Sequence, residues 1–510
     1  MNKNVTAKRT ILALLMGATL LTACTDKVEW VSTTFEHPWQ AGEVEALTAE
    51  AAEAAEATVV VDPDRTLQTM EGFGTCASEL SWNSLSVLTR EERNAIFHEL
   101  FALGVGASFR MARTPIGASD FALEYYSYDD VDGDFALEHF SIDRDKNYLI
   151  PFLQSAQAEN PALRVWGSPW CPPAWLKVNK HYANSSTLPI RRRVEEMRRQ
   201  IEHMPEDIRA AGGSTFGFNP MNLEDNGLAE DKQIREGTDA FTLEPAYLDA
   251  YARYFGKYVD AYREQGIDIY MVMPQNEPNS AQWYPACTWT PDGLKQFIAV
   301  LGPEMQKRGV EVWLGTIERA DVHMWDQIVN DPEAGPYIKG LGFQWAGKEA
   351  LPGMHAEFPE LPCYMTEQEC GNGANDWKGA MHSWDLMREY ITNGCQGYFY
   401  WNTSLFEGES STWGWNQNSL VTVSREQKTW RFTPEYYIIK HASHYVAPGA
   451  KVVKLDGTYG DSLAFVNPDG KVVVLAANQS EEAKPVTFRV VGKKARTALL
   501  PANSLNTFVF

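Results

Sequence analysis

Short apolar runs alternate with amphipathic stretches along most of the chain. The amphipathic segments Tyr247–Gln265 and Gly293–Arg308 repeat their apolar residues with helical spacing, whereas each apolar run has the length of a buried strand. Strands that alternate with helices predict βαβ units and a parallel sheet. Because eight parallel strands close into a barrel, we predict an α/β fold, a (β/α)8 TIM barrel, over residues 71–440. The eight runs begin at Glu71, Ser108, Leu163, Ile269, Val310, Leu341, Cys363 and Gly397.

One spacing in this pattern is irregular. A long segment separates the runs at Leu163 and Ile269, and it contains Arg191-Arg192-Arg193 and the stretch Gly212–Gly237. A barrel tolerates insertions in its βα loops, and those loops surround its mouth. We therefore expect this insertion to shape a substrate cleft.

The pattern changes near Tyr445. From there on, short apolar runs such as Lys471–Ala477 are separated by Asp-Gly and similar turns, and helical periodicity disappears. This predicts a small antiparallel β domain over residues 441–510. A strand at Thr58–Asp62, within residues 58–70, is expected to join it.

The N-terminus has the features of an export signal. Three basic residues precede Ile11–Leu21, an apolar stretch too short to span a bilayer. The following Leu21-Thr22-Ala23-Cys24 resembles the bacterial lipobox, in which the chain is cut before a cysteine that then carries lipid. We predict a signal peptide over residues 1–23, a lipid anchor at Cys24 and a solvated tether over residues 24–57, hence an exported lipoprotein on the periplasmic or cell-surface face. The alternative is an ordinary secretory peptide in which the cysteine is accidental.

Charge and cysteine content narrow the possible partners. A net charge of −22 and a pI near 4.9 disfavour binding to nucleic acid or to anionic lipid headgroups, so membrane contact is expected only through the lipid. The other six cysteines form no C-x-x-C pair and no Cys/His cluster, so we expect no metal, and no organic cofactor is implied. Their even number permits disulfides in an exported protein without requiring them.

A glutamate follows the fourth predicted strand. Met273-Pro-Gln-Asn-Glu-Pro278 closes an apolar run, so Glu277 is expected at the C-terminal face of the barrel, where such barrels hold their active sites. Asn276 beside it is placed to bind a sugar hydroxyl. The alternative is a surface glutamate in a βα loop.

Two glutamates compete at the end of the seventh strand, in Tyr364-Met-Thr-Glu-Gln-Glu-Cys-Gly371. Glu367 and Glu369 share one face of a strand, and we choose Glu367 because it lies nearer the strand end. Strands four and seven lie on opposite sides of the ring, so Glu277 and Glu367 converge across the mouth. Two carboxyls about 5–5.5 Å apart allow a retaining glycosidase mechanism. Glu277 is then the acid/base and Glu367 the nucleophile, since the acid must hold a proton that the nucleophile has lost.

The order of these motifs resembles glycoside hydrolase family 30, the clan A group that includes lysosomal glucosylceramidase. The resemblance extends from about Thr58 to the C-terminus and implies a barrel with a companion β-sandwich built from both chain ends. The matching motifs are Gly72-Phe-Gly74, Arg113-Thr-Pro-Ile-Gly-Ala-Ser-Asp120-Phe, Ser168-Pro-Trp-Cys-Pro-Pro-Ala-Trp-Leu-Lys177, Asn276-Glu277-Pro278, Thr366-Glu367 and Tyr400-Trp-Asn402.

Residue roles follow from this resemblance. It implies that Glu277 is the acid/base, that Glu367 is the nucleophile, and that six further residues bind substrate. Asp120 and Trp170 would grip the hydroxyls of a non-reducing glucose, Arg113 would lie near the nucleophile, and Asn276 would bind the 2-hydroxyl. Trp345 and Trp401 would be aromatic residues of the pocket. An ion pair between Arg113 and Asp120, and core packing of Trp170, are the structural alternatives.

Two departures bear on specificity. Gln368-Glu369 stands before Cys370 where glucosylceramidase has one residue, which keeps Glu369 open as the nucleophile. Gln344 precedes Trp345 where a histidine is expected. We therefore predict a glucosylceramidase-like, exo-acting, retaining β-glucosidase. The alternatives are an endo-β-1,6-glucanase of the same family and a non-catalytic carbohydrate-binding lipoprotein.

Overall fold

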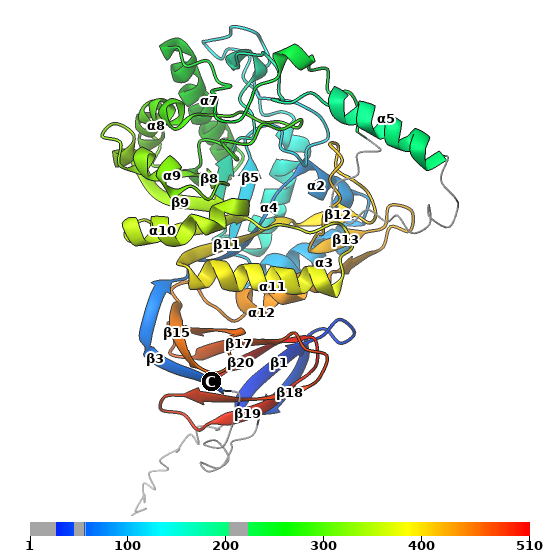
Figure 1. Cartoon of the computed structure of the whole chain (residues 1–510), viewed down its shortest axis with the longest axis vertical. Coiled ribbons are helices and arrows are strands. Elements are labelled where there is room, and N and C mark those ends of the chain that lie inside the picture. The colour runs from blue at the N-terminus through cyan, green and yellow to red at the C-terminus, as the bar shows by residue number, and fades with distance from the viewer. Residues whose placement is uncertain (1–26, 45–55, 57, 203–222) are drawn as a thin grey trace, which may run out of the picture.

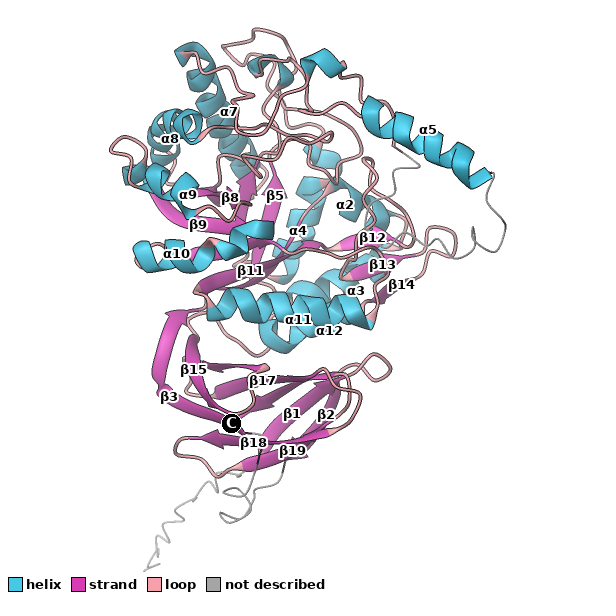
Figure 2. Ribbon diagram, in the orientation of Figure 1, coloured by secondary structure: helices cyan, strands magenta, loops and turns pink. Residues whose placement is uncertain are grey.

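The structure is a computed structural model that describes residues 27–44, 56, 58–202 and 223–510. Eight parallel strands form a closed barrel with helices around it, which confirms the predicted fold class (Figures 1 and 2). The strands are β4 (Gly72–Cys76), β5 (Met111–Pro115), β6 (Arg164–Ser168), β7 (Ile269–Val272), β8 (Glu311–Ile317), β9 (Ile338–Gln344), β10 (Cys363–Glu367) and β11 (Cys395–Asn402). The second strand begins at Met111 and not at Ser108, whose φ of +55° is not extended.

Several helices begin at a residue whose side chain caps them. Thr89 and Glu92 form a reciprocal capping box, and the Asp376 side chain accepts from the backbone N–H of Gly379, so both satisfy amides that lack a partner within their helix. The described helices are α2 (Glu79–Ser86), α3 (Arg90–Phe101), α4 (Leu149–Glu159), α5 (Leu188–Glu202), α7 (Pro245–Glu264), α8 (Pro291–Gln306), α9 (Val322–Val329), α10 (Leu351–Glu357), α11 (Trp377–Thr392) and α12 (Pro434–Ser443).

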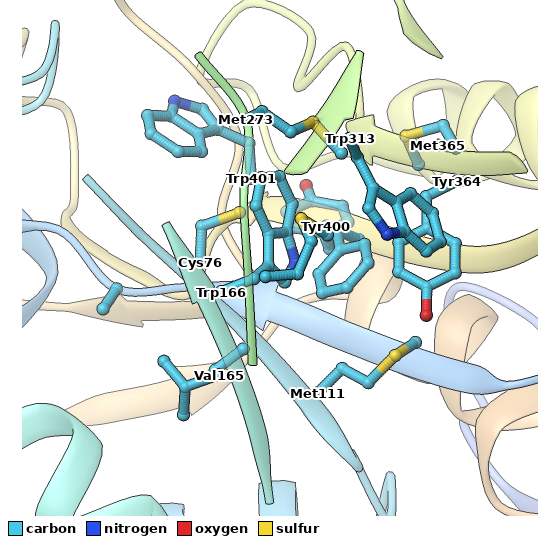
Figure 3. Close-up of a cluster of buried hydrophobic side chains, with 14 of the residues drawn as sticks. Cys76, Met111, Val165, Trp166, Met273, Trp313, Tyr364, Met365, Tyr400 and Trp401 are labelled. Carbon is cyan, nitrogen blue, oxygen red and sulfur yellow. The ribbon is translucent and has the colours of Figure 1, made fainter. Parts of the chain in front are cut away.

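The barrel interior is a packed core. Large buried side chains from several strands, among them Trp166, Trp313, Tyr364 and Met273, fill it (Figure 3). Gly342 on β9 leaves room for this packing, because a Cβ there would lie 2.4 Å from the Met273 methyl carbon. A filled core provides a rigid floor for whatever lies at the strand ends.

The sandwich is a nine-stranded sheet drawn from both ends of the chain, in the order β19-β18-β3-β15-β16-β17-β20-β1-β2. All neighbouring strands are antiparallel except β3 and β18, which run parallel. The strands are β1 (Val28–Thr33), β2 (Gln40–Val44), β3 (Thr58–Thr69), β15 (Lys451–Gly457), β16 (Ser462–Val466), β17 (Val472–Asn478), β18 (Lys484–Val490), β19 (Arg496–Leu500) and β20 (Ser504–Val509). A small sheet of β12 (Ser404–Phe406), β13 (Val421–Val423) and β14 (Trp430–Phe432) lies beside the barrel.

The tether predicted for residues 24–57 is wrong over Val28–Val44. This segment forms the hairpin β1–β2, and β1 pairs with β20 at the other end of the chain, Glu29 opposite Val509. Val28 and Val44 are buried in the sandwich core because one face of the hairpin packs inward. The predicted signal peptide and Cys24 lie outside the described residues.

Helix α12 joins the two domains. Its buried His441 makes hydrogen bonds of 2.8 Å through both ring nitrogens, to the Thr33 hydroxyl on β1 and the Thr507 hydroxyl on β20. Burial lowers the pKa of His441 to about 3, so the ring is neutral and donates through one nitrogen while it accepts through the other. Figure 1 shows α11 and α12 between the barrel and the sandwich.

Candidate active site

A cleft of about 340 Å³ opens where the barrel strands end. Its walls come from segments that follow β5 to β11, which places the cleft at the C-terminal face of the barrel. The lining residues are Asp120, Trp170, Glu277, Ser280, Gln282, Tyr284, Glu318, Arg319, Trp345, Ala346, Glu367, Trp415 and Gln417.

Glu277 is held in an unusual backbone conformation just beyond β7. Its φ of +48° lies in the left-handed region, which costs a non-glycine residue on the order of 1–3 kcal/mol. Its backbone N–H donates to the Thr316 hydroxyl at 3.0 Å, and the Asn276 N–H donates to the Pro169 carbonyl at 2.7 Å. These bonds to β8 and to the loop after β6 hold the turn, so the side chain faces the cleft in a fixed direction.

Glu367 is the last residue of β10 and is 5% exposed. Arg113, on β5, is fully buried and donates to Glu367 Oε2 at 2.9 Å and to Asn276 Oδ1 at 2.6 Å. Its guanidinium carbon lies 4.5 Å from the centre of the Trp170 ring. Arg113 therefore lies beneath the cleft and holds Glu367 and Asn276 from below; it pairs with Glu367, and no ion pair with Asp120 occurs among the described residues.

Gln344, the last residue of β9, connects the two glutamates. Its side-chain nitrogen lies 3.0 Å from Glu277 Oε1 and 3.3 Å from Glu367 Oε2. Its carbonyl oxygen accepts from the Thr366 hydroxyl at 2.9 Å, which orients the amide with its nitrogen toward the carboxyls. Sequence reasoning noted Gln344 only as a departure from the expected histidine and missed this bridging position.

The surroundings of the two glutamates favour one shared proton. Burial raises the pKa of both Glu277 and Glu367, and Arg113 opposes that rise at Glu367 through a direct hydrogen bond. Each carboxylate also disfavours ionisation of the other. Because Arg113 donates directly to Glu367 and stabilises its anion, the geometry favours the proton on Glu277.

Glu369 lies away from the cleft. β10 ends at Glu367, so the two residues no longer share a strand face, and Glu369 makes ion pairs with Lys348 at 2.8 Å and His382 at 3.5 Å. Hydrogen bonds from His382 and Lys348 lower the pKa of Glu369, against the effect of burial. Of the two competing glutamates, the structure brings only Glu367 to Glu277.

The other predicted substrate residues fall into two groups. Asp120, Trp170 and Trp345 line the cleft, and Oδ1 of the buried Asp120 has no hydrogen-bond partner in the described part of the chain. Asn276 is 4% exposed, and its Oδ1 accepts from Arg113, Thr316 and Gln344, which turns its NH₂ group away from them.

Trp401 is not an aromatic residue of the pocket wall. It stacks under Trp170 with ring centres 5.1 Å apart, and Phe121 packs edge-on against it, so the ring is 1% exposed. Its place in the last strand of the barrel puts it in the floor, where it supports Trp170 and Arg113. The pocket prediction for Trp401 is therefore corrected to a supporting position.

Sequence reasoning missed several cleft residues. Glu318 directly follows β8, the same strand-end signal that marked Glu277 and Glu367, and it could have been found that way. Tyr284 and Ser280 carried no such signal; the Tyr284 hydroxyl lies 3.4 Å from Glu277 Oε2. Of the long segment between β6 and β7, Trp170 lines the cleft, whereas the described residues at 188–202 and 223–237 do not. Glu236 in this segment accepts from the cleft residue Arg319 at 2.8 Å.

Neither a metal cluster nor a disulfide marks the described part of this site. Within the described ranges, no group of three or more His, Cys, Asp or Glu residues is placed to hold a metal ion. The cysteines at 76, 171, 287, 363, 370 and 395 are buried and unbridged. None of the described helices is both long and apolar enough to cross a bilayer.

Comparison with known proteins agrees with this geometry. The model of the glycosyl hydrolase family 30 TIM-barrel domain matches residues 70–193 and 220–446, and that of the family 30 beta sandwich domain matches residues 449–508. The lysosomal acid glucosylceramidase of Mus musculus is 24% identical over 479 residues, 89% of this chain and 83% of that protein. An endo-1,6-beta-D-glucanase of Neurospora crassa is 26% identical over 479 residues, 89% of this chain and 87% of that protein.

Solved structures share the fold. SrfJ from Salmonella typhimurium superposes with a TM-score of 0.77 at 20% identity, covering 95% of this chain and 99% of its own. The endo-beta1,6-glucanase BT3312 superposes with a TM-score of 0.74 at 24% identity, covering 94% and 99%. The two family models together match most of the chain, and so the protein belongs to glycosyl hydrolase family 30 and is a glycosidase of that family.

Proposed function

We propose that the protein is a retaining β-glucosidase that removes a terminal β-linked glucose by double displacement. The observation that carries this proposal is the pair of buried glutamates bridged by one amide nitrogen of Gln344. Because both oxygens contact the same nitrogen, Glu277 Oε1 and Glu367 Oε2 can be no farther apart than the sum of the two contact distances. That limit accommodates the roughly 5–5.5 Å between the carboxyls of retaining enzymes.

The two steps use the protonation states that the site favours. Glu367, ionised beside Arg113, attacks the anomeric carbon, and Glu277 gives its proton to the departing glycosidic oxygen. Glu277, now ionised, takes a proton from water, which attacks the same carbon and releases Glu367. Two inversions give net retention, and both carboxyls return to their starting states.

The part of the cleft lined by Asp120 and Trp170 suits one glucosyl unit. Oδ1 of Asp120 lacks a partner in the described structure, and a sugar hydroxyl would satisfy it. Trp170 lines the same part of the cleft, and the NH₂ group of Asn276 is placed for the 2-hydroxyl. A hydrogen bond to the 2-hydroxyl that strengthens in the transition state contributes to the rate.

The first test compares p-nitrophenyl β-D-glucoside with a β-1,6-linked glucan, and products are separated by size. We expect glucose from the aryl glucoside, with the β anomer formed first in ¹H NMR spectra. Initial release of the α anomer would contradict retention. Inactivity on every β-glucoside would contradict the sugar assignment.

An endo-β-1,6-glucanase is the second candidate. The side of the cleft beyond Glu277 has a polar lining, including Ser280, Gln282 and Arg319, which suits a carbohydrate leaving group better than a lipid chain. Relatives with this activity are known at 26% identity. Short β-1,6 oligomers released from the polymer would support this candidate; terminal glucose alone would contradict it.

A bell-shaped pH profile is expected for kcat/KM. Activity falls with acid as Glu367 takes up a proton, and with alkali as Glu277 loses its proton. Because burial raises the pKa of Glu277, this side chain keeps its proton at pH values above the usual glutamate pKa of about 4.3. The alkaline limb of the profile is therefore expected at a higher pH than for an ordinary glutamate. Measurements from about pH 4 to about pH 9 on cyclohexylmethyl β-D-glucoside, whose leaving group needs the proton of Glu277, check this. The alkaline limb should disappear in Glu277→Gln, and its persistence would assign that limb to another group.

We further propose that the chain is exported and anchored through lipid on Cys24, on the evidence of its N-terminal sequence. Expressed in a bacterium, the parent should appear in the membrane fraction with a lipid-modified N-terminal cysteine detected by mass spectrometry. Cys24→Ser should appear in the soluble fraction. A parent that is cleaved elsewhere and carries no lipid would contradict the anchor.

A further inference from the structure

One more buried carboxyl faces the cleft besides the catalytic pair and Asp120. Glu318 directly follows β8, lines the cleft and is 1% exposed. Its Oε1 accepts from the backbone N–H of Asn279 at 2.8 Å and lies 3.4 Å from the Ser280 hydroxyl. Its Oε2 is buried and has no hydrogen-bond partner among the described residues. The double-displacement steps do not use this group, so its unmet hydrogen-bonding capacity needs a partner.

Glu318 forms no ion pair within the described part of the chain. The neighbouring Arg319 donates instead to Glu236 Oε1 at 2.8 Å and to the Asn279 carbonyl at 2.9 Å. Glu277, a carboxyl of like charge, lines the same cleft. Burial, reinforced by Glu277, raises the pKa of Glu318 to about 8. Near neutral pH the side chain therefore carries a proton, and since Oε1 already accepts the Asn279 N–H, Oε2 is the oxygen left to donate.

The position of Glu318 places it on the leaving-group side. It is bonded to Asn279 and Ser280, two and three residues beyond Glu277, the residue that protonates the departing oxygen. The glucosyl unit is expected toward Asp120 and Trp170, on segments that follow β5 and β6. A hydrogen-bond donor at Glu318 would therefore contact the leaving group and not the glucosyl unit.

We propose that Glu318 is a specificity-determining residue that donates a hydrogen bond from Oε2 to a hydroxyl oxygen of a carbohydrate leaving group. This inference rests on the proposed β-glucosidase function and extends it: the preferred substrates are β-glucosides of sugars over β-glucosides of apolar alcohols. A buried donor without a partner penalises a leaving group that lacks the oxygen, which is how polar sites reject apolar analogues.

The test uses two substrates with matched leaving groups. The leaving group of gentiobiose is a hydroxylated sugar that departs through a primary oxygen. The leaving group of cyclohexylmethyl β-D-glucoside departs through a similar oxygen but has no hydroxyls. Both need protonation by Glu277, so their kcat/KM ratio isolates recognition of the leaving group. The full-length protein, Glu318→Gln, Glu318→Met and Glu318→Ala are compared. The ratio is independent of the folded fraction, because both rates come from the same sample.

We expect the gentiobiose preference to fall about tenfold in Glu318→Ala and Glu318→Met, the effect of losing one hydrogen bond. Glu318→Gln should keep the ratio within about twofold of the parent, since the amide accepts from Asn279 and donates in place of the acid. Glu435→Ala is the matched control. Glu435 is also buried with an unpartnered Oε2 among the described residues, but it lies on α12 and does not line the cleft, so its loss should not change the ratio.

Two outcomes would overturn the inference. An unchanged ratio in Glu318→Ala would remove Glu318 from recognition, and equal losses on both substrates would in that case assign it a general structural role. A Glu318→Gln variant that loses the preference as fully as Glu318→Ala would show that the carboxylate, not a proton donor, is required. If the parent protein is inactive on both glucosides, by contrast, the proposed β-glucosidase function is wrong, and the proposed role of Glu318 is wrong with it.

Discussion

Glu367→Gln is expected to lower kcat/KM by about 10⁴-fold or more on aryl and alkyl β-glucosides alike. The amide cannot form the glycosyl ester, so the first displacement fails whatever the leaving group. The comparison is made on p-nitrophenyl β-D-glucoside and cyclohexylmethyl β-D-glucoside, with the folded fraction followed by thermal melting. The melt matters because the substitution leaves the buried Arg113 guanidinium without its carboxylate partner.

Glu369→Gln is the matched control for that loss. Glu369 lies two residues farther along, but it is paired with Lys348 and His382 and does not line the cleft. We expect this variant to keep most of the parent activity. The reverse pattern, an active Glu367→Gln and an inactive Glu369→Gln, would make Glu369 the nucleophile.

A chemical rescue gives an independent reading of the same assignment. In Glu367→Gly, azide can occupy the space of the lost carboxylate and attack the anomeric carbon opposite the leaving group. Because only one displacement then occurs, we expect α-glucosyl azide from an activated aryl glucoside. Formation of the β azide would mean that the removed carboxylate acted on the leaving-group face.

The barrel could be predicted from sequence because its strands are buried on both faces. Such strands appear as continuous apolar runs, and the glutamates at their ends are visible against them. Glu277 and Glu367 were found in this way. The ambiguity between Glu367 and Glu369 could not be resolved from spacing, since it depends on β10 ending at Glu367 and on Lys348 and His382 lying near Glu369.

The hairpin β1–β2 could not be predicted for a different reason. Its neighbour towards the middle of the sheet, β20, is at the opposite end of the chain, so the local sequence does not show the pairing that holds Val28–Thr33 in the sandwich. Val44 precedes an Ala- and Glu-rich run that suggested a tether for the whole region. Only long-range pairing distinguishes the strands from the run that follows them.

The supporting residues of the site depend on three-dimensional packing. Gln344 bridges carboxyls that come from two other strands, and Trp401 is covered by Trp170 and Phe121 from loops distant in sequence. The family resemblance implied a pocket position for Trp401, but whether such a side chain lines the cleft or its floor is decided by what packs over it. Glu318 shows the opposite case, since the strand-end rule would have found it had it been applied to β8.

Glu277→Gln is expected to separate substrates by the basicity of their leaving group. On cyclohexylmethyl β-D-glucoside, whose alkoxide cannot depart without a proton, kcat/KM should fall by about 10²–10⁴-fold. On 2,4-dinitrophenyl β-D-glucoside, whose phenolate needs no proton, kcat/KM should fall by less than about tenfold. The N–H of Glu277 bonded to Thr316 is a backbone group, so the substitution leaves the turn itself intact.

The second displacement extends this prediction to kcat. Glu277 also activates the water that hydrolyses the glycosyl-enzyme, so with the dinitrophenyl substrate the variant should accumulate that intermediate, with kcat and KM falling together and a burst of dinitrophenolate. Azide needs no general base, and with Glu277→Gly it should restore turnover and give β-glucosyl azide, because it attacks from the face that the leaving group has vacated. An equal loss of kcat/KM on both substrates, without a burst, would mean that Glu277 acts on the glucosyl unit and not on the leaving oxygen. The acid would then have to be sought among the other cleft carboxyls, of which Asp120 and Glu318 also have pKa values raised by burial.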